Sequence, residues 1–192
     1  LIPINSRQKA LFLAKELELS GLDWDIYTSA TLHISYGSIG DAKKAFSKLL
    51  KLANKGIKKA IISSALAKIM QGPLHNISEA KTLFNGADIS RNNDYAYLPI
   101  LIDISENKFS DAREKLATCH KINSTCSCLY YAFISKGIGG NKDLIQANQI
   151  LEKAYLKWPK TNANNYAWQK ATYLEKPIYN PKEALRALEN IP

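Results

Sequence analysis

Apolar and small side chains recur every three or four residues along most of this chain, which is the period of one face of an α-helix. The clearest case is the segment 126–159, where an apolar, aromatic run is followed by a glycine-rich turn and a second amphipathic run. The turn, residues 136–143, holds three glycines in four positions, so a helix that continues through it is unfavourable. Trp158-Pro159 ends the second run. The pattern predicts a hairpin of two helices.

The same hairpin pattern recurs along the chain, with a small residue early in the second helix of each unit. These anchors are 32, 38, 32, 35 and 37 residues apart, and each is followed four positions later by a small or apolar residue. The anchors are Ala10, Ala42, Ala80, Ala112, Ala147 and Ala184, and the residues four positions later are Ala14, Phe46, Phe84, Leu116, Leu151 and Leu188. A recurrence near 35 residues indicates an array of helical repeats.

The more variable first helices of the units are predicted over residues 25–36, 59–70, 94–105, 127–136 and 164–174. No stretch of useful length alternates with a period of two, so no strand is expected. About ten or eleven helices in antiparallel pairs are predicted. The chain is interpreted as one repeat domain, 1–192, with a half repeat at 1–20 and units at 22–54, 57–90, 93–121, 126–159 and 163–192.

Composition limits the classes of protein that fit. Hydrophobic residues make up 46% of the 192, which favours a folded core, and no apolar run is long enough to span a membrane. The formal net charge is +9, mostly from lysines such as those between residues 43 and 59. A solvated lysine-rich surface is the favoured interpretation, and an anionic partner is kept as an alternative. Leu1 in place of an initiator methionine is interpreted as the start of a processed or trimmed piece.

The unit at 126–159 resembles a Sel-one-like repeat, a subfamily of the tetratricopeptide (TPR) class. The matching residues are Gly137, Gly139, Lys142, Asp143, Ala147, Ala154 and Pro159. Trp168, sixteen residues before Ala184, matches the usual aromatic residue of a first helix. The resemblance covers nearly the whole chain, with the most specific motif in this unit. It implies an all-α fold, a right-handed α-solenoid of stacked antiparallel helix pairs with a concave binding surface.

The resemblance further implies a non-enzymatic protein–protein interaction scaffold, expected in a bacterial cell-envelope or secretion/export assembly. A periplasmic or secreted location is favoured over the cytoplasm. Aromatic residues dominate interface hot spots, so Tyr95, Tyr130, Tyr166 and Lys170 are predicted to contact a protein partner on the concave face. The alternative is a solenoid that binds an anionic polymer, an exopolysaccharide or a nucleic acid, through its lysines.

Three cysteines form a cluster, and the resemblance suggests a pairing. In a solenoid the end of one unit meets the start of the next, so a disulfide from Cys119 to Cys126, or else to Cys128, is a candidate. The alternative, three reduced and buried thiols, stays open because the compartment is not fixed by the sequence. Zinc held by these cysteines and His120 is disfavoured, because adjacent ligands on a helix diverge and Cys-x-Cys lacks the usual spacing.

No catalytic signature is present in the sequence. The Gly-x-Ser-x-Gly, Walker and HExxH motifs are all missing. The glycines near residue 138 do not form a phosphate loop, because neither a preceding strand nor a following Lys-Ser/Thr accompanies them. No enzyme activity, small-molecule substrate, cofactor or metal is therefore expected.

Overall fold

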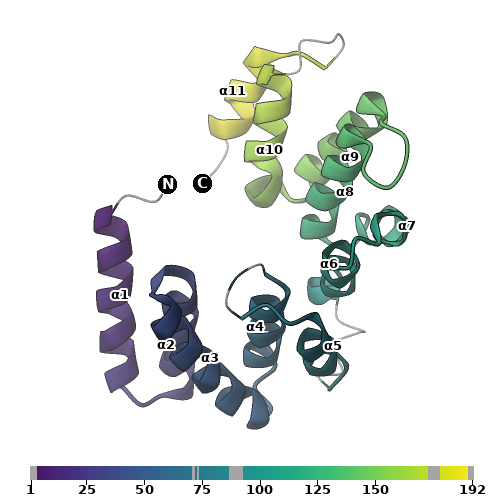
Figure 1. Ribbon diagram of the computed structural model, residues 1–192. Helices are drawn as coiled ribbons and strands as arrows, with labels where there is room; N and C mark the ends of the chain where they lie inside the picture. The colour runs from purple at the N-terminus through teal and green to yellow at the C-terminus, as the bar shows by residue number, and fades with distance from the viewer. Residues whose placement is uncertain (1–3, 71, 73, 87–92, 173–177, 190–192) are drawn as a thin grey trace. The chain divides into compact units, whose positions relative to one another are not determined.

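The computed structural model describes residues 4–70, 72, 74–86, 93–172 and 178–189 (Figure 1). In this part of the chain 81% of the residues are helical and no strand occurs, as the sequence predicted. The helices are α1 (Ile4–Leu19), α2 (Asp23–Tyr36), α3 (Ile39–Asn54), α4 (Lys58–Ile69), α5 (Ile77–Gly86), the short 3₁₀ helix η1 (Asn93–Tyr95), α6 (Leu98–Ser105), α7 (Phe109–Cys119), α8 (Ser124–Lys136), α9 (Leu144–Lys157), α10 (Pro159–Thr172) and α11 (Pro181–Glu189).

The chain divides into two compact units, Leu1–Ile89 and Ser90–Pro192, called unit 1 and unit 2 below. Within each unit every α-helix packs against the next one in the chain. In addition, α4 contacts α2, and α10 contacts α8. The boundary between the units, after residue 89, lies one residue before the end of the predicted repeat 57–90. The organisation of the whole chain as one repeat domain stays a prediction.

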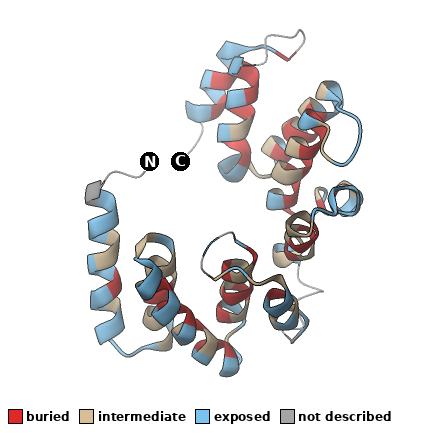
Figure 2. Cartoon of the chain, in the orientation of Figure 1, coloured by how far each residue is buried: buried red, intermediate tan, exposed pale blue. Residues whose placement is uncertain are grey.

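The core of unit 1 lies between α2, α3 and α4. The anchor Ala42 and the residue four positions later, Phe46, are both buried on α3, and Leu49 next to them is fully buried. This stripe follows from the three-to-four-residue spacing of α3. Ser38 and Asp41 cap the helix reciprocally, which fixes where α3 begins. Buried residues lie where consecutive helices face each other (Figure 2).

The core of unit 2 is built on the same anchors. Ala112 and Ala147, at the contact between their helices and the preceding ones, are fully buried, as are Leu116 and Leu151. A small residue at each of these places allows neighbouring helices to approach closely. The anchors Ala112 and Ala147 are therefore core residues, and the assignment of the chain to repeats stays a prediction.

The glycine-rich turn between α8 and α9 is where the sequence placed it. Gly137 ends α8 in a left-handed conformation, with φ of 72°, and the Asp143 side chain accepts a hydrogen bond from the Gln146 N–H to start α9. The turn also contacts α7, because a Cβ on Gly139 would lie 2.3 Å from the Phe109 carbonyl oxygen. Arg113 of α7 donates to two carbonyl oxygens of the same turn. The turn thus holds α7 as well as connecting α8 to α9.

We expect Gly139→Ala to lower the free energy of unfolding by at least about 2 kcal/mol, because a left-handed backbone alone costs a non-glycine residue about 1–2 kcal/mol. The collision with Phe109 adds to that cost. Gly56→Ala is the matched control, since Gly56 also has a positive φ but has nothing within 4 Å of its added Cβ. Urea unfolding of both variants measures the two changes. An equal decrease in the free energy of unfolding would show that close contact of the turn with α7 adds nothing to the cost.

Two helix starts differ from the prediction, and proline explains both. The helix expected over residues 164–174 begins already at Pro159, where a missing N–H and a fixed φ suit the first helical position. The helix expected from residue 94 begins only at Leu98, with Pro99 in its first turn and η1 before it. In both cases proline starts the helix.

Candidate partner-binding groove

A groove of about 360 Å³ lies between α10 and α11 in unit 2. Its lining residues are spaced by three and four positions on each helix, so each helix contributes one face. They are Asn164, Ala167, Trp168 and Ala171 on α10, and Pro181, Ala184, Leu185 and Leu188 on α11. The groove is almost wholly apolar, and we call it the α10–α11 groove.

Three large apolar side chains line this groove and face solvent. Trp168 is 67% exposed, Leu185 64% and Leu188 44%. Single exposed apolar residues are common on protein surfaces, but several together around a groove mark an interaction site. The α10–α11 groove is therefore the strongest candidate for a binding surface in the described part of the chain.

The position of α11 is fixed by the residue that precedes it. The Asn180 side chain accepts from the Glu183 N–H at 3.2 Å and donates to the Glu183 carboxylate, also at 3.2 Å. Pro181 at the first helical position adds a pre-set φ. These contacts and the proline together cap the first turn of α11. The Asn180 backbone N–H also donates to the Lys170 carbonyl oxygen at 2.8 Å, which ties the start of α11 to α10.

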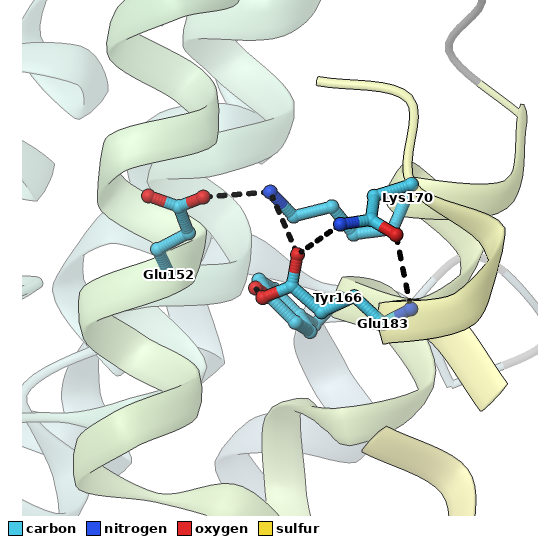
Figure 3. A network of polar contacts seen from close by, with 5 residues as sticks. Glu152, Tyr166, Lys170 and Glu183 are labelled. Carbon is cyan, nitrogen blue, oxygen red and sulfur yellow. Dashed lines mark hydrogen bonds and ion pairs between the residues drawn. The ribbon is translucent and has the colours of Figure 1, made fainter. Parts of the chain in front are cut away.

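A polar network beneath the groove joins α9, α10 and α11 (Figure 3). The Lys170 ammonium lies 2.7 Å from Glu152 on α9 and 3.7 Å from Glu183 on α11, and Figure 3 shows it between the two carboxylates. The Tyr166 hydroxyl donates to Glu183 at 2.5 Å. Lys170 and Tyr166 are each only 4% exposed. Because the network links three helices, it holds the two walls of the groove at a fixed separation.

The Tyr166 phenol also stacks on the ring of Tyr155, with 4.5 Å between the ring centroids. Burial is the main cause of its raised pKa, followed by the hydrogen bond to the Glu183 carboxylate. A tyrosine whose pKa is raised by folding keeps its proton up to a higher pH in the folded chain than in the unfolded chain. Folding is thus coupled to pH through this residue.

We expect stability to depend on pH through Tyr166. A raised folded-state pKa gives stability that is complete below the unfolded value and is lost as the pH rises towards the folded value. The unfolding free energy of the native chain should thus fall above about pH 10 more steeply than that of Tyr166→Phe, by up to about 1.4 kcal/mol per pH unit. Urea unfolding at a series of pH values measures both slopes. Parallel curves would contradict the coupling.

The structure places the four predicted partner contacts as follows. Tyr166 and Lys170 belong to the network beneath the groove, and Tyr130 is 8% exposed and packs on the His120 ring at 4.8 Å. Tyr95, in η1, is partly exposed. Three of the four side chains are thus largely buried within unit 2. Contact of these four residues with a partner stays a prediction.

The structure joins Cys119, the last residue of α7, to Cys126 in the first turn of α8 as a disulfide, with 5.6 Å between the Cα atoms. Cys128 is a free thiol that donates to the Asn162 side-chain oxygen at 3.0 Å, and burial raises the pKa of this thiol. The His120 ring nitrogen Nδ1 contacts the Leu116 carbonyl oxygen at 3.1 Å, and burial lowers the pKa of His120. The residues weighed as zinc ligands thus have other partners.

A second cleft, of about 320 Å³, lies in unit 1 between α1, α2 and α3. Lys48 and Lys51 line it from α3, and Lys55 lines it from the position directly after that helix, at spacings of three and four. Two of these lysines pair with acids across the cleft: Lys48 with Glu18, and Lys55 with Asp23 at 2.6 Å. The cleft collects part of the lysine excess that the sequence showed, but its own acids offset much of the charge.

The α10–α11 groove was not predicted from the sequence. Trp168 was matched to the usual aromatic residue of a first helix, and Leu188 to the small or apolar residue that follows each anchor by four positions. The signal in the sequence that could have indicated this groove is the spacing of its α11 residues. Pro181, Ala184, Leu185 and Leu188 are three or four positions apart and share one apolar face of that helix.

Comparisons with known proteins place the chain in no group: no family model matches it, and neither the curated proteins nor the solved structures give a significant match. Among the described residues no helix is long and apolar enough to cross a membrane. No cluster of three or more potential metal-ligating His, Cys, Asp or Glu side chains occurs in the same part of the chain.

Proposed function

We propose that this chain is a non-enzymatic scaffold of the TPR-like class, with Sel-one-like repeats, that binds other proteins. The observation that carries the proposal is the α10–α11 groove, where Trp168, Leu185 and Leu188 face solvent together. Helical hairpins packed in sequence, with buried small anchors near a 35-residue period, support the repeat class. An α-solenoid over the whole chain belongs to the same proposal.

The Cys119–Cys126 pair supports placing the scaffold in an oxidising compartment. Disulfides persist in the periplasm and outside the cell, whereas the cytosol keeps thiols reduced. A bacterial envelope or secretion assembly fits this chemistry, and it is the setting that the resemblance implies. The location is part of the proposal.

Capture of proteins on the immobilised chain tests the proposal, and the Leu185→Lys variant is the comparison. Leu185 is 64% exposed, so a lysine there charges the groove without disturbing the core. Leu156→Lys on α9, at an 80% exposed leucine outside the groove, is the matched control. We expect a protein other than the chain itself to be retained by the native and Leu156→Lys forms and lost from Leu185→Lys. Titration of that purified protein should reproduce the difference.

An alternative function is supported by the lysine-lined cleft of unit 1. Lys48, Lys51 and Lys55, followed along the chain by the exposed Lys58 and Lys59, form a basic strip that suits an anionic polymer. Binding of this kind weakens steeply with salt. Heparin and single-stranded DNA serve as probes in a salt titration, with Lys51→Glu as the variant. Binding that is insensitive to both salt and Lys51→Glu would contradict this function.

A further inference from the structure

One stretch of unit 1 carries many lysines and no acid. Residues 42–78 contain eight lysines and neither aspartate nor glutamate. Four of them are spaced by four, three and four positions, so they form a single row: Lys44, Lys48 and Lys51 of α3, and Lys55 directly after that helix. Neighbours in such a row are about 5–6 Å apart between their Cβ atoms. The row suits a polymer that carries negative charges at short, regular intervals.

Only part of this positive charge is neutralised within unit 1. Three of the eight lysines, Lys48, Lys55 and Lys68, pair with acids. In the part of the chain that the structure describes, the other five form no ion pair, and all are exposed: Lys43, Lys44, Lys51, Lys58 and Lys59. Unit 1 therefore keeps a positively charged surface for an anionic partner.

An exposed tryptophan lies at the end of the lysine row. Lys55 pairs with Asp23 at 2.6 Å, and the next residue of α2, Trp24, is 56% exposed. The Lys59 ammonium lies 4.5 Å from the centroid of the Trp24 ring. Proteins that bind single-stranded nucleic acid combine a positively charged surface for the backbone with aromatic side chains on which bases stack. Both parts are present here.

The Trp24 ring is supported by α2 and α4. It stacks on Tyr27, with 5.2 Å between the ring centroids and 30° between the ring planes. Tyr27 packs against the core between α2, α3 and α4, and its hydroxyl lies 3.0 Å from the Ser63 hydroxyl on α4. These contacts orient the Trp24 ring before a ligand arrives, which lowers the entropy cost of binding.

The groups around Trp24 favour a nucleic acid over an acidic polysaccharide. Recognition of a sugar requires acceptors for its hydroxyl groups, and carboxylates are strong acceptors. Asp23, which precedes Trp24, is already paired with Lys55. Asp25, which follows it, lies about 100° around α2, on the side of the buried Ser29. Bases in a single strand can be unstacked and laid on an exposed ring, whereas those in a duplex stay stacked on each other.

We propose that unit 1 binds single-stranded nucleic acid, with one base stacked on Trp24 and the neighbouring phosphates on the lysines of α3 and α4. The Lys59 ammonium then moves from the ring to a phosphate, and Lys51 contacts another. This inference rests on the alternative function given above, because it names the anionic polymer and adds a contact that charge alone does not supply.

Binding of a labelled oligothymidylate and of an abasic strand of the same length separates stacking from charge. At low salt, fluorescence anisotropy should show that the full-length chain binds the oligothymidylate about tenfold more tightly, which is within the contribution of one base stacked on an aromatic ring. Trp24→Leu should lose this difference and bind the abasic strand as the native chain does. Trp168→Leu, at a 67% exposed tryptophan of unit 2, is the matched control and should behave as the native chain. Circular dichroism confirms that each variant is folded.

Two further measurements test the contacts one at a time. Lys51→Gln should reduce the slope of log affinity against log salt by about 0.7 for both strands, because one phosphate contact is lost. Lys160→Gln, at an exposed lysine of α10, should leave that slope unchanged. Bound oligothymidylate should quench tryptophan fluorescence in the native chain and in Trp168→Leu, but not in Trp24→Leu.

The outcomes separate this inference from the function on which it rests. Equal affinity of the native chain for the two strands overturns the inference and leaves a polymer bound by charge alone. Heparin bound more tightly than the oligothymidylate, and weakened by Trp24→Leu, also overturns it, because the ring then stacks on a sugar. A chain that binds none of these polyanions at low salt removes both the inference and the alternative function.

Discussion

Replacing Lys170 by methionine is expected to lower the free energy of unfolding by about 3 kcal/mol, the lower end of what removal of one partner from a buried ion pair costs. Lys170 is 4% exposed and is the cation shared by Glu152 and Glu183. Methionine keeps most of the length and packing of the side chain, so the loss reports the missing charge. The two carboxylates keep about 40% of their side-chain surface exposed, which limits the penalty.

Two further variants isolate the effect of the charge. Lys160→Met lies on the same helix but at an exposed position, so it should change stability by less than about 0.5 kcal/mol. Glu152→Gln added to Lys170→Met should recover part of the loss, because it removes a carboxylate that has lost its partner. Chemical unfolding measures all three. If Lys170→Met is no worse than Lys160→Met, the network does not hold the three helices together.

The buried face of several helices could be predicted from the sequence because its signals are local. Ala112 and Leu116, or Ala147 and Leu151, are four residues apart on one helix, and their spacing alone places them on one face. The turn after Lys136 was equally clear, since glycine is suited to the left-handed conformation that Gly137 adopts. These features depend on residues close together in the chain.

The roles of Tyr166 and Lys170 could not be predicted in the same way. Their partners, Glu152 and Glu183, lie 13 to 18 positions away along the chain, on two other helices. From the sequence, an aromatic and a cationic residue one turn apart looked like a surface for a partner. Only the packing of α9, α10 and α11 shows that both point inward.

The exposure of Leu188 could not be predicted from the residues near it in the sequence either. It follows Ala184 by four positions, as the fully buried Leu151 follows Ala147. The difference is whether another helix follows to cover it, and the spacing within α11 carries no information on that. For this reason the groove is evident only in the structure, although three of its lining residues, Trp168, Ala184 and Leu188, are part of the sequence pattern.

The second large effect expected is the loss of the Cys119–Cys126 bridge. A double variant, Cys119→Ser with Cys126→Ser, should lower the free energy of unfolding by about 2.5 kcal/mol, because a bridge closing a loop of about eight residues removes that much chain entropy from the unfolded state. The bridge joins α7 to α8 across the turn that Asn123 caps through its hydrogen bond from the Cys126 N–H. Its removal should also let α6 and α7 unfold before α8 and α9.

Thiol counting decides whether the bridge forms in the protein as isolated. In denaturant without reductant, one reactive cysteine per chain is expected, and it is Cys128. In the native protein that thiol should react slowly, because burial raises its pKa and its hydrogen goes to Asn162. Cys128→Ser keeps both cysteines of the bridge and should lose little stability. Three reactive thiols, or a melting temperature that a reductant leaves unchanged, would show that α7 and α8 are held by packing alone and would remove the support for an oxidising compartment.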